Sequence, residues 1–243
     1  MLWRELDDQK SVARSLSNLA NIVQMQGDNA GAGWLYVEAL SIFQRIGDWT
    51  GVAWTMNYQG DVARDQGDSE AAQTMYEQSL AIFRKLDERW GIAGTLADLG
   101  SLAREQENYP TANSMYRESM KLFQELGHQR GIARLLEHFA CSAAAQLESE
   151  RSMRLAGAAA ALRKNIGAPL TPAEGAKLDA SLYSARQALT NTVAEAAWSE
   201  GWDTPVEKAV EGVLVVESES LRTSERSLGR PEADAKQIQV PPL

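Results

Sequence analysis

Four side chains suited to holding an extended partner lie close together in the sequence. They are Trp54, Asn57, Asp61 and Arg64. Because they are separated by steps of three or four residues, one face of a helix would present all of them. An asparagine amide can bond a peptide backbone, a guanidinium can bind a carboxylate, and a tryptophan ring can anchor an apolar side chain. The chemistry indicated is recognition rather than bond making or breaking.

Similar side chains recur further along the chain. Arg104 stands 40 residues after Arg64, and Arg134 lies three residues before Glu137. These arginines would form a line of guanidiniums that favours a partner with acidic groups. The predicted partner-binding residues are Arg14, Asn21, Trp54, Asn57, Asp61, Arg64, Ser101, Arg104, Arg134 and Glu137. The alternative for each of them is a polar side chain that only faces water.

The sequence motifs of the common catalytic and metal sites are absent. The chain has no GxxxxGK[ST], GxSxG, HExxH or CxxC segment. Of its two histidines, His128 is expected in a solvated turn and His138 on a partner-facing helix. Cys141 is expected to be a small packing residue. We therefore expect no enzymatic activity, no cofactor and no metal.

The overall charge argues against nucleic acids and anionic membranes as ligands. The 243 residues carry a formal net charge of −9, and the pI is near 4.9. Phosphate backbones and anionic lipids attract basic surfaces, which this composition does not favour. No apolar run approaches the roughly 18 residues of a membrane-spanning helix. A single cysteine allows no internal disulfide and suits a reducing compartment, so we expect a cytoplasmic protein.

A register of 40 residues runs through the first two thirds of the chain. The residues that coincide at this shift include Tyr36, Tyr76 and Tyr116, then Phe43, Phe83 and Phe123, and also Gly51, Gly91 and Gly131. Regular repeats of this length indicate stacked supersecondary units, each of which is too small to bury a core alone.

Each repeat contains two apolar stripes of helical period. Gly67 and Asp68 separate the two stripes of one repeat, where glycine ends one helix and the aspartate caps the next. Gly60 and Gly100 occupy equivalent positions in the first stripe, where the absence of a side chain lets two helices approach closely. Each repeat is therefore predicted to be a helix hairpin.

The spacing within the repeat resembles the tetratricopeptide repeat. If Gly60 is counted as position 8, Gly67 falls at position 15 and Tyr76 at position 24. That family carries a small residue, a glycine and an aromatic residue at those positions. A period of 40 rather than 34 residues resembles its kinesin-light-chain type, which has longer helices. The resemblance implies an all-α, right-handed superhelical solenoid of about four hairpins, whose first helices line a concave groove that binds peptides or proteins.

The C-terminal third carries a second resemblance. The segment SMRLAGAAAALRKNIGAPLTPAEGAKLDASLYSARQAL, followed by AEAAWSEGW and VEKAVEGVL, is similar to the C-terminal end of large bacterial signalling ATPases with LuxR-type, AfsR-type or cyclase outputs. Their nucleotide-binding loop is missing from this chain. The resemblance implies a fragment or a separated arm of a transcriptional regulator that acts in signal transduction.

Three parts are expected along the chain. Residues 1–167 should hold the repeats, residues 168–216 the capping helices, and residues 217–243 a polar, serine-rich tail without stable structure. The capping helices are expected near 172–189, 191–201 and 204–216. A capping box at Thr171–Glu174 starts the first of them. Trp198 and Trp202 are expected to cover the open end of the repeat stack.

The first residues of the chain align with the end of a second helix. LWRELDD at residues 2–8 matches IFQRIGD at residues 42–48, so we expect a truncated first repeat and a new helix near residue 10. Leu2, Trp3 and Leu6 would then lack a preceding repeat to cover them. Such an uncovered face predicts a weak homodimer through the N-terminal end.

Two functions stay open on the sequence alone. The first is a protein-interaction scaffold that binds a peptide or partner protein in the concave groove. The second is a sensor arm of an ATPase-type transcriptional regulator, which binds a small effector and passes the signal to other modules.

Overall fold

The computed structural model describes residues 2–215, with side chains from residue 8 onward. Its elements are α-helices, and the described residues contain no strand, so the predicted all-α fold is confirmed. The predicted tail at 217–243 and the side chains of Leu2, Trp3 and Leu6 lie outside these described residues. Within the described part, no helix has both the length and the apolar character needed to cross a bilayer.

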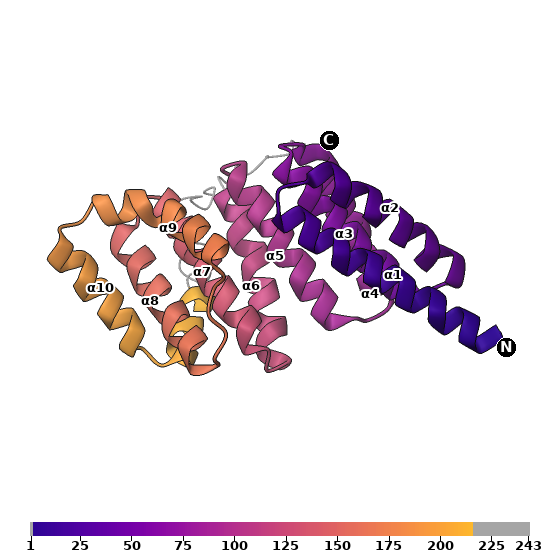
Figure 1. Cartoon of the computed structure of the whole chain (residues 1–243). Helices are drawn as coiled ribbons and strands as arrows, with labels where there is room; N and C mark the ends of the chain where they lie inside the picture. The colour runs from indigo at the N-terminus through magenta and orange to yellow at the C-terminus, as the bar shows by residue number, and fades with distance from the viewer. Residues whose placement is uncertain (1, 216–243) are drawn as a thin grey trace, which may run out of the picture.

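Eight helices form the four predicted hairpins. The pairs are α1 (Leu2–Met25) with α2 (Asn29–Ile46), α3 (Trp49–Asp65) with α4 (Ser69–Lys85), α5 (Arg89–Glu105) with α6 (Tyr109–Glu125), and α7 (Gln129–Ala145) with α8 (Ser149–Asn165). The second helix of each hairpin also packs on the first helix of the next one. Figure 1 shows the resulting stack, which runs from α1 and α2 at one end to α8 near the other.

Short capped turns join consecutive helices. Gly47 and Gly67 adopt φ values of 70° and 80°, the left-handed region that glycine reaches without steric strain. The next residue in each case, Asp48 or Asp68, accepts a hydrogen bond from a backbone N–H three residues later, at 3.1 and 3.0 Å. The glycine-aspartate breaks predicted from the sequence are confirmed.

The expected break before residue 10 is wrong. Helix α1 is continuous from Leu2 to Met25, and its 24 residues make it longer than any other described helix. Asp7 stands where Gly47 and Gly127 occupy the equivalent turns. Asp87 does adopt a left-handed φ of 51° in a third such turn, where the packing of α4 against α5 holds it. No helix of the described residues packs ahead of α1, so nothing compensates the strain of such a turn and the helix continues.

The core lies where the two helices of each hairpin cross. Tyr36, Tyr76 and Tyr116 are completely buried there. A Cβ atom added to Gly60 would come within 2.6 Å of the Tyr76 ring, which explains why the crossing position must be small. The hydroxyl of each tyrosine points out of the core toward the first helix of its hairpin; that of Tyr76 donates to Asp61 at 2.7 Å.

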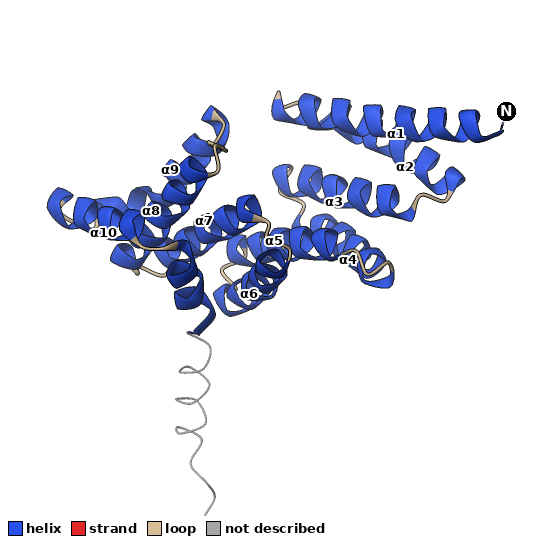
Figure 2. Ribbon diagram, turned by 90° about the horizontal axis from the view of Figure 1, so that it is seen from below, coloured by secondary structure: helices blue, strands red, loops and turns tan. Residues whose placement is uncertain are grey.

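The C-terminal helices pack against the last hairpin on two different sides. They are α9 (Pro172–Gln187), α10 (Asn191–Asp203) and a helix over residues 206–215, close to the predicted ranges. Helix α10 packs tightly on α8, because Gly157 and Gly201 let the two backbones meet. Helix α9 lies instead against α7, which is the first helix of the last hairpin (Figure 2). The expectation that all three only cover the end of the stack therefore fails for α9.

The two predicted capping tryptophans differ in exposure. Trp198 on α10 is partly buried against the core of the last hairpin. Trp202 is 36% exposed, and the Lys164 ammonium lies 5.2 Å from the centre of its ring. Trp198 therefore supplies more of the covering contact, while Trp202 forms a cation–π contact at the surface.

The close approach at Gly60 predicts a large effect of one added methyl group. Gly60→Ala should lower the free energy of unfolding by about 1–3 kcal/mol, because the new Cβ overlaps the Tyr76 ring. Gly33→Ala is the matched control: Gly33 lies within α2 with no atom near its would-be Cβ, so this change should raise stability by up to about 1 kcal/mol. Urea unfolding followed by circular dichroism measures both. Equal stabilities of the two variants would contradict the packing described.

Candidate functional site

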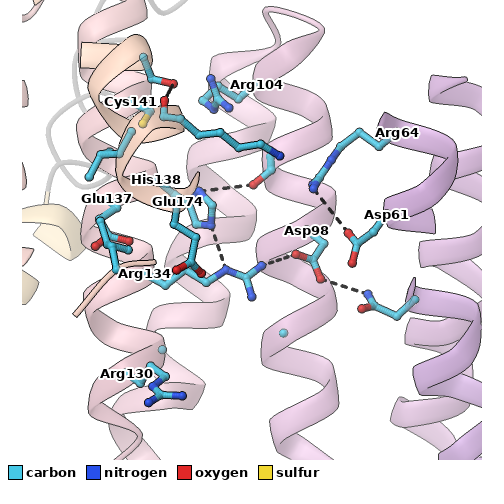
Figure 3. Close-up of a pocket in the computed structure, with 18 of the residues that line it drawn as sticks. Asp61, Arg64, Asp98, Arg104, Arg130, Arg134, Glu137, His138, Cys141 and Glu174 are labelled. Carbon is cyan, nitrogen blue, oxygen red and sulfur yellow. Dashed lines mark hydrogen bonds and ion pairs between the residues drawn. The ribbon is translucent and has the colours of Figure 1, made fainter. Parts of the chain in front are cut away.

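The concave side of the stack holds an open cavity of about 840 Å³. Three first helices and α9 supply most of its lining (Figure 3). Its polar and charged lining includes Asn57, Asp61 and Arg64 from α3; Asp98, Ser101 and Arg104 from α5; Arg134, Glu137 and His138 from α7; and Glu174, Lys177 and Ser181 from α9. We call this cavity the groove. The 40-residue register puts the same face of each first helix into it.

Eight of the ten residues predicted to bind a partner line the groove. They are Trp54, Asn57, Asp61, Arg64, Ser101, Arg104, Arg134 and Glu137. The other two are on α1 and do not line it. Asn21 accepts a hydrogen bond from Tyr36 at 2.6 Å, and Arg14 is exposed on the surface. The part of the concave face that α1 contributes is therefore separate from the cavity.

Asp98 joins the first helices of three consecutive repeats. Asn57 on α3 donates to one of its carboxylate oxygens at 3.1 Å, and Arg134 on α7 forms an ion pair with the other. The carboxylate belongs to a residue that is only 6% exposed, so both oxygens need such partners. Figure 3 shows this connection across the floor of the groove. The middle of the groove is thus fixed in place before any partner arrives.

Asp61 sits beside this connection in a less favourable environment. Its carboxylate accepts from Tyr76 at 2.7 Å and lies 3.5 Å from the guanidinium of Arg64. Burial, and then the negative charge of Asp98, raise the pKa of Asp61 to about 6, while Arg64 and Tyr76 oppose that shift. The carboxyl group therefore exchanges its proton at a mildly acidic pH.

His138 acts here as a neutral hydrogen-bond acceptor. Its Nε2 atom accepts from Arg134 Nε at 3.2 Å, and its ring stacks on Tyr116 with centroids 5.2 Å apart. Burial, and then the charge of Arg134 and other arginines, keep its pKa well below the usual value. Burial likewise raises the pKa of the nearby Cys141 thiol in the lining, so the thiol stays protonated.

Glu137 is occupied by a partner from the same hairpin. Both of its carboxylate oxygens bond the Arg163 guanidinium from α8, one of them at 2.9 Å. Arg163 also donates to the carbonyl of Ala168 at 3.2 Å, in the link that leads to α9. This bidentate ion pair and the bond to Ala168 hold the start of the segment that leads to α9.

No group of three or more His, Cys, Asp or Glu side chains in the described part of the chain is arranged to hold a metal.

The predicted line of guanidiniums is interleaved with carboxylates. The groove lining contains Asp61, Asp65, Asp98, Glu105, Glu137 and Glu174, against Arg64, Arg104, Arg130, Arg134, Arg163 and Lys177. Stacking therefore gives a groove of balanced charge rather than a cationic one. Arg64, Arg134 and Arg163 already have carboxylate partners within it.

Three cations of the groove keep donors open. Arg104 is 21% exposed, lies 3.7 Å from Glu105, and has a buried Nε with no hydrogen-bond partner. Arg130 and Lys177 form no ion pair with any described residue. In Figure 3, Arg104 and Arg130 lie on opposite sides of the Asp98 connection. The cations with open donors therefore lie around the Asn57–Asp98–Arg134 connection and not within it.

An aromatic cluster forms the apolar end of the groove. Trp54 packs against Trp90 with ring centroids 4.5 Å apart and against Phe83 at 4.8 Å. Trp90, at the start of α5, is 43% exposed. Trp54 is partly covered by these neighbours, so the open aromatic surface belongs to Trp90, a residue that sequence reasoning did not select.

Some other groove residues were detectable in the sequence, and some were not. Tyr58, Asp98 and His138 occupy one register position, which directly follows that of Asn57 along the helix. A wider helical face would have included them. Lys177 and Ser181 gave no such signal, because only the fold brings α9 onto the concave side.

The raised pKa of Asp61 predicts that stability falls as the pH rises. Between its ordinary pKa of 3.8 and its folded pKa of about 6, the folded state binds more protons than the unfolded state, so the free energy of unfolding decreases with pH. Asp61→Asn keeps an acceptor for Tyr76 and cannot ionise. Relative to the wild type, this variant should gain on the order of 1 kcal/mol across that range. Urea unfolding of both proteins between about pH 4 and pH 7 checks it; parallel stability curves would contradict it.

Comparisons with known proteins agree with this repeat structure. The sequence model of the tetratricopeptide repeat family matches residues 11–85. No curated protein sequence matches the chain. Among solved structures, BtubC (BKLC) from P. vanneervenii is similar at 16% identity with a TM-score of 0.62, over 99% of this chain and 91% of that one.

A second solved structure is also similar to this chain. It is a putative kinesin light chain from Podosopora anserina with nearly identical TPR-like repeats, at 15% identity with a TM-score of 0.53, over 88% of this chain and 98% of that one. Identities this low show a shared fold. Together with the 40-residue register and the family match over residues 11–85, they show that the chain has the fold of tetratricopeptide-repeat proteins with repeats of the kinesin-light-chain-like type.

Proposed function

We propose that the chain is a non-catalytic scaffold that holds an extended segment of a partner protein in the groove. Tetratricopeptide repeats generally mediate contacts between proteins. The single observation that carries the proposal is the groove itself, a cavity of about 840 Å³ that crosses three repeats and presents polar side chains from each. A segment lying across it would meet a new set of donors and acceptors at every repeat.

The fixed centre supports this proposal. Asn57 and Arg134 are both already bonded to Asp98, so the three side chains lose little freedom when a partner binds. A preorganised surface of this kind converts more of its contact energy into affinity.

The open donors indicate which chemistry the partner carries. Arg64 and Arg134 have carboxylate partners in the groove, whereas Arg104 has a longer contact of 3.7 Å with Glu105 and a buried Nε without a hydrogen-bond partner. An acidic group of the partner would satisfy Arg104, with Lys177 as a second cation of the same groove. The exposed ring of Trp90 would take an apolar side chain. We therefore propose a segment with at least one acidic and one apolar residue.

A sensor that binds a small effector is the second candidate. Helix α9 covers part of the concave side, and the resulting cavity falls within the roughly 300–1,000 Å³ typical of small-molecule sites. In this case the chain would be the regulatory arm of a bacterial ATPase-type transcriptional regulator. That role, and a cytoplasmic location, rest on the sequence resemblance and on the lone Cys141.

Capture of a partner distinguishes the two candidates. The full chain is immobilised and exposed to a native lysate. The retained proteins are then identified by mass spectrometry. A retained protein is then purified, and its affinity is measured by isothermal titration calorimetry. Native mass spectrometry of the chain isolated from cells tests for a retained small molecule; if one is found and no protein is captured, the sensor becomes the better explanation.

The scaffold proposal predicts which variants weaken the binding of a captured partner. Arg104→Ala and Trp90→Ala should each reduce the binding free energy by about 1–3 kcal/mol. Trp54→Ala should act in the same direction, because Trp54 supports Trp90. Arg104→Glu should also slow association and flatten its salt dependence.

Two controls locate the binding surface. Trp34→Ala removes a tryptophan that is 78% exposed on α2 and does not line the groove, so it should leave affinity unchanged. Glu77→Lys changes the charge of an exposed residue on α4 that is also outside the groove lining. If Glu77→Lys abolished binding while the Arg104 and Trp90 variants bound normally, the partner would lie on the second helices and the groove assignment would be wrong.

A further inference from the structure

One face of α1 combines exposed apolar residues with an absence of charge. Val12, Leu19 and Ile22 are 49%, 48% and 53% exposed. From Ser11 to Gln26 the sequence contains a single charged residue, Arg14. An exposed helix face normally carries charged side chains, so this one is unusual for a surface left in water. We call it the α1 face.

The internal repeats show how such a face is used. Val52, Val62 and Leu99 occupy the register positions of Val12, Ile22 and Leu19, either 40 or 80 residues later. They are 0%, 7% and 5% exposed, because each packs on the second helix of the preceding hairpin. Val62, for example, belongs to the same buried cluster as Tyr36 of α2. The α1 face therefore has the composition of a surface that packs against another helix.

The opposite end of the stack is closed. Helix α10 lies along α8, where the backbone of Gly201 meets that of Arg154. Helix α9 also packs on this last hairpin, against α7 and α8. Figures 1 and 2 show α10 and α1 at opposite ends of the molecule. A second copy of the chain therefore finds no free α8 surface on which to place its α1 face, so head-to-tail stacking is blocked. The α1 face of a second copy carries the same exposed apolar side chains without charge, and therefore matches that of the first.

We propose that two copies of this chain associate through their α1 faces as a two-fold symmetric dimer. Val12, Ser15, Leu19 and Ile22 follow one another at steps of three and four residues, the spacing of a helix–helix seam. An antiparallel pair of such helices is self-complementary: Val12 of each copy lies toward Ile22 of the other, with Ser15 and Leu19 near the axis.

The dimer forms reversibly and does not extend into a filament. Three large apolar side chains from each copy bury less than the roughly 1,600 Å² of a standard stable interface. A two-fold contact also uses the same surface on both copies, so no free α1 face remains for a third chain. The dimer uses the described residues Val12, Leu19 and Ile22, rather than Leu2, Trp3 and Leu6, which the sequence suggested.

Sedimentation of the full chain at concentrations from about 1 to 300 µM tests the proposal. The wild type should shift from monomer to dimer within that range. The double variant Leu19→Glu, Ile22→Glu should stay monomeric throughout, because it places charges across the seam. The matched control is Trp34→Glu, Val37→Glu, which alters two exposed apolar residues of the neighbouring helix α2 and should dimerise like the wild type. A monomeric wild type, assemblies larger than a dimer, or loss of the dimer in the control alone would each overturn the proposal.

Cysteine cross-linking gives a second measurement that does not depend on the charged variant folding. Ser15→Cys places a thiol near the proposed axis, and Ser41→Cys places one at an exposed position of α2. Mild oxidation should convert the Ser15→Cys chain to a covalent dimer much faster than the Ser41→Cys chain. The native Cys141 is buried and contributes equally to both. Equal rates would refute the α1 contact, whereas groove variants such as Arg104→Ala should leave the cross-linking rate unchanged.

Discussion

A helix hairpin of about 40 residues has too little interior to bury its own apolar side chains, so each repeat of this chain depends on its neighbour. Val52, Val62 and Leu99 illustrate this dependence, since each becomes buried only when the second helix of the preceding repeat packs over it. The small residues at the hairpin crossings bring the helices close enough for this contact. The curved stack, the concave side and the different properties of its two ends all follow from this repeated packing.

Stacking also determines the electrostatics of the concave side. Stacking brings the Arg134 guanidinium to the Asp98 carboxylate of the preceding first helix, and the Asp98 side chain is only 9% exposed, so its charge would be strongly unfavourable without a partner. Asp98 is therefore bonded from both sides by Asn57 and Arg134. Asp61, with a weaker set of partners, responds to burial and to Asp98 by a raised pKa. Arg104 and Arg130 lie on either side of this centre, and the side chain of Arg104 is 21% exposed.

Much of the fold could be predicted from local features of the sequence. Glycine before aspartate ends one helix and caps the next at Gly47-Asp48 and Gly67-Asp68, and these breaks need no distant contact. The spacing of apolar residues places Tyr76 of α4 in the core. On α3, it leaves Asn57 on the face that lines the groove. Eight of ten predicted groove residues follow from this periodicity alone. The local match to the turn pattern did not predict the structure at Asp7. A left-handed turn there would need a packed neighbouring helix to hold it.

The sequence by itself thus determined the helices, their caps, the register and the faces that meet, because these depend on residues within about one turn of one another or on a repeated spacing. Only the tertiary structure decided which charges neutralise each other, since Arg134 and Asp98 are brought together from neighbouring repeats by the stacking distance. It also decided that α9 turns onto α7 and adds Lys177 to the groove. That placement depends on the bidentate ion pair of Glu137 with Arg163 and on the hydrogen bond from Arg163 to the Ala168 carbonyl. These contacts join segments that share no local sequence pattern.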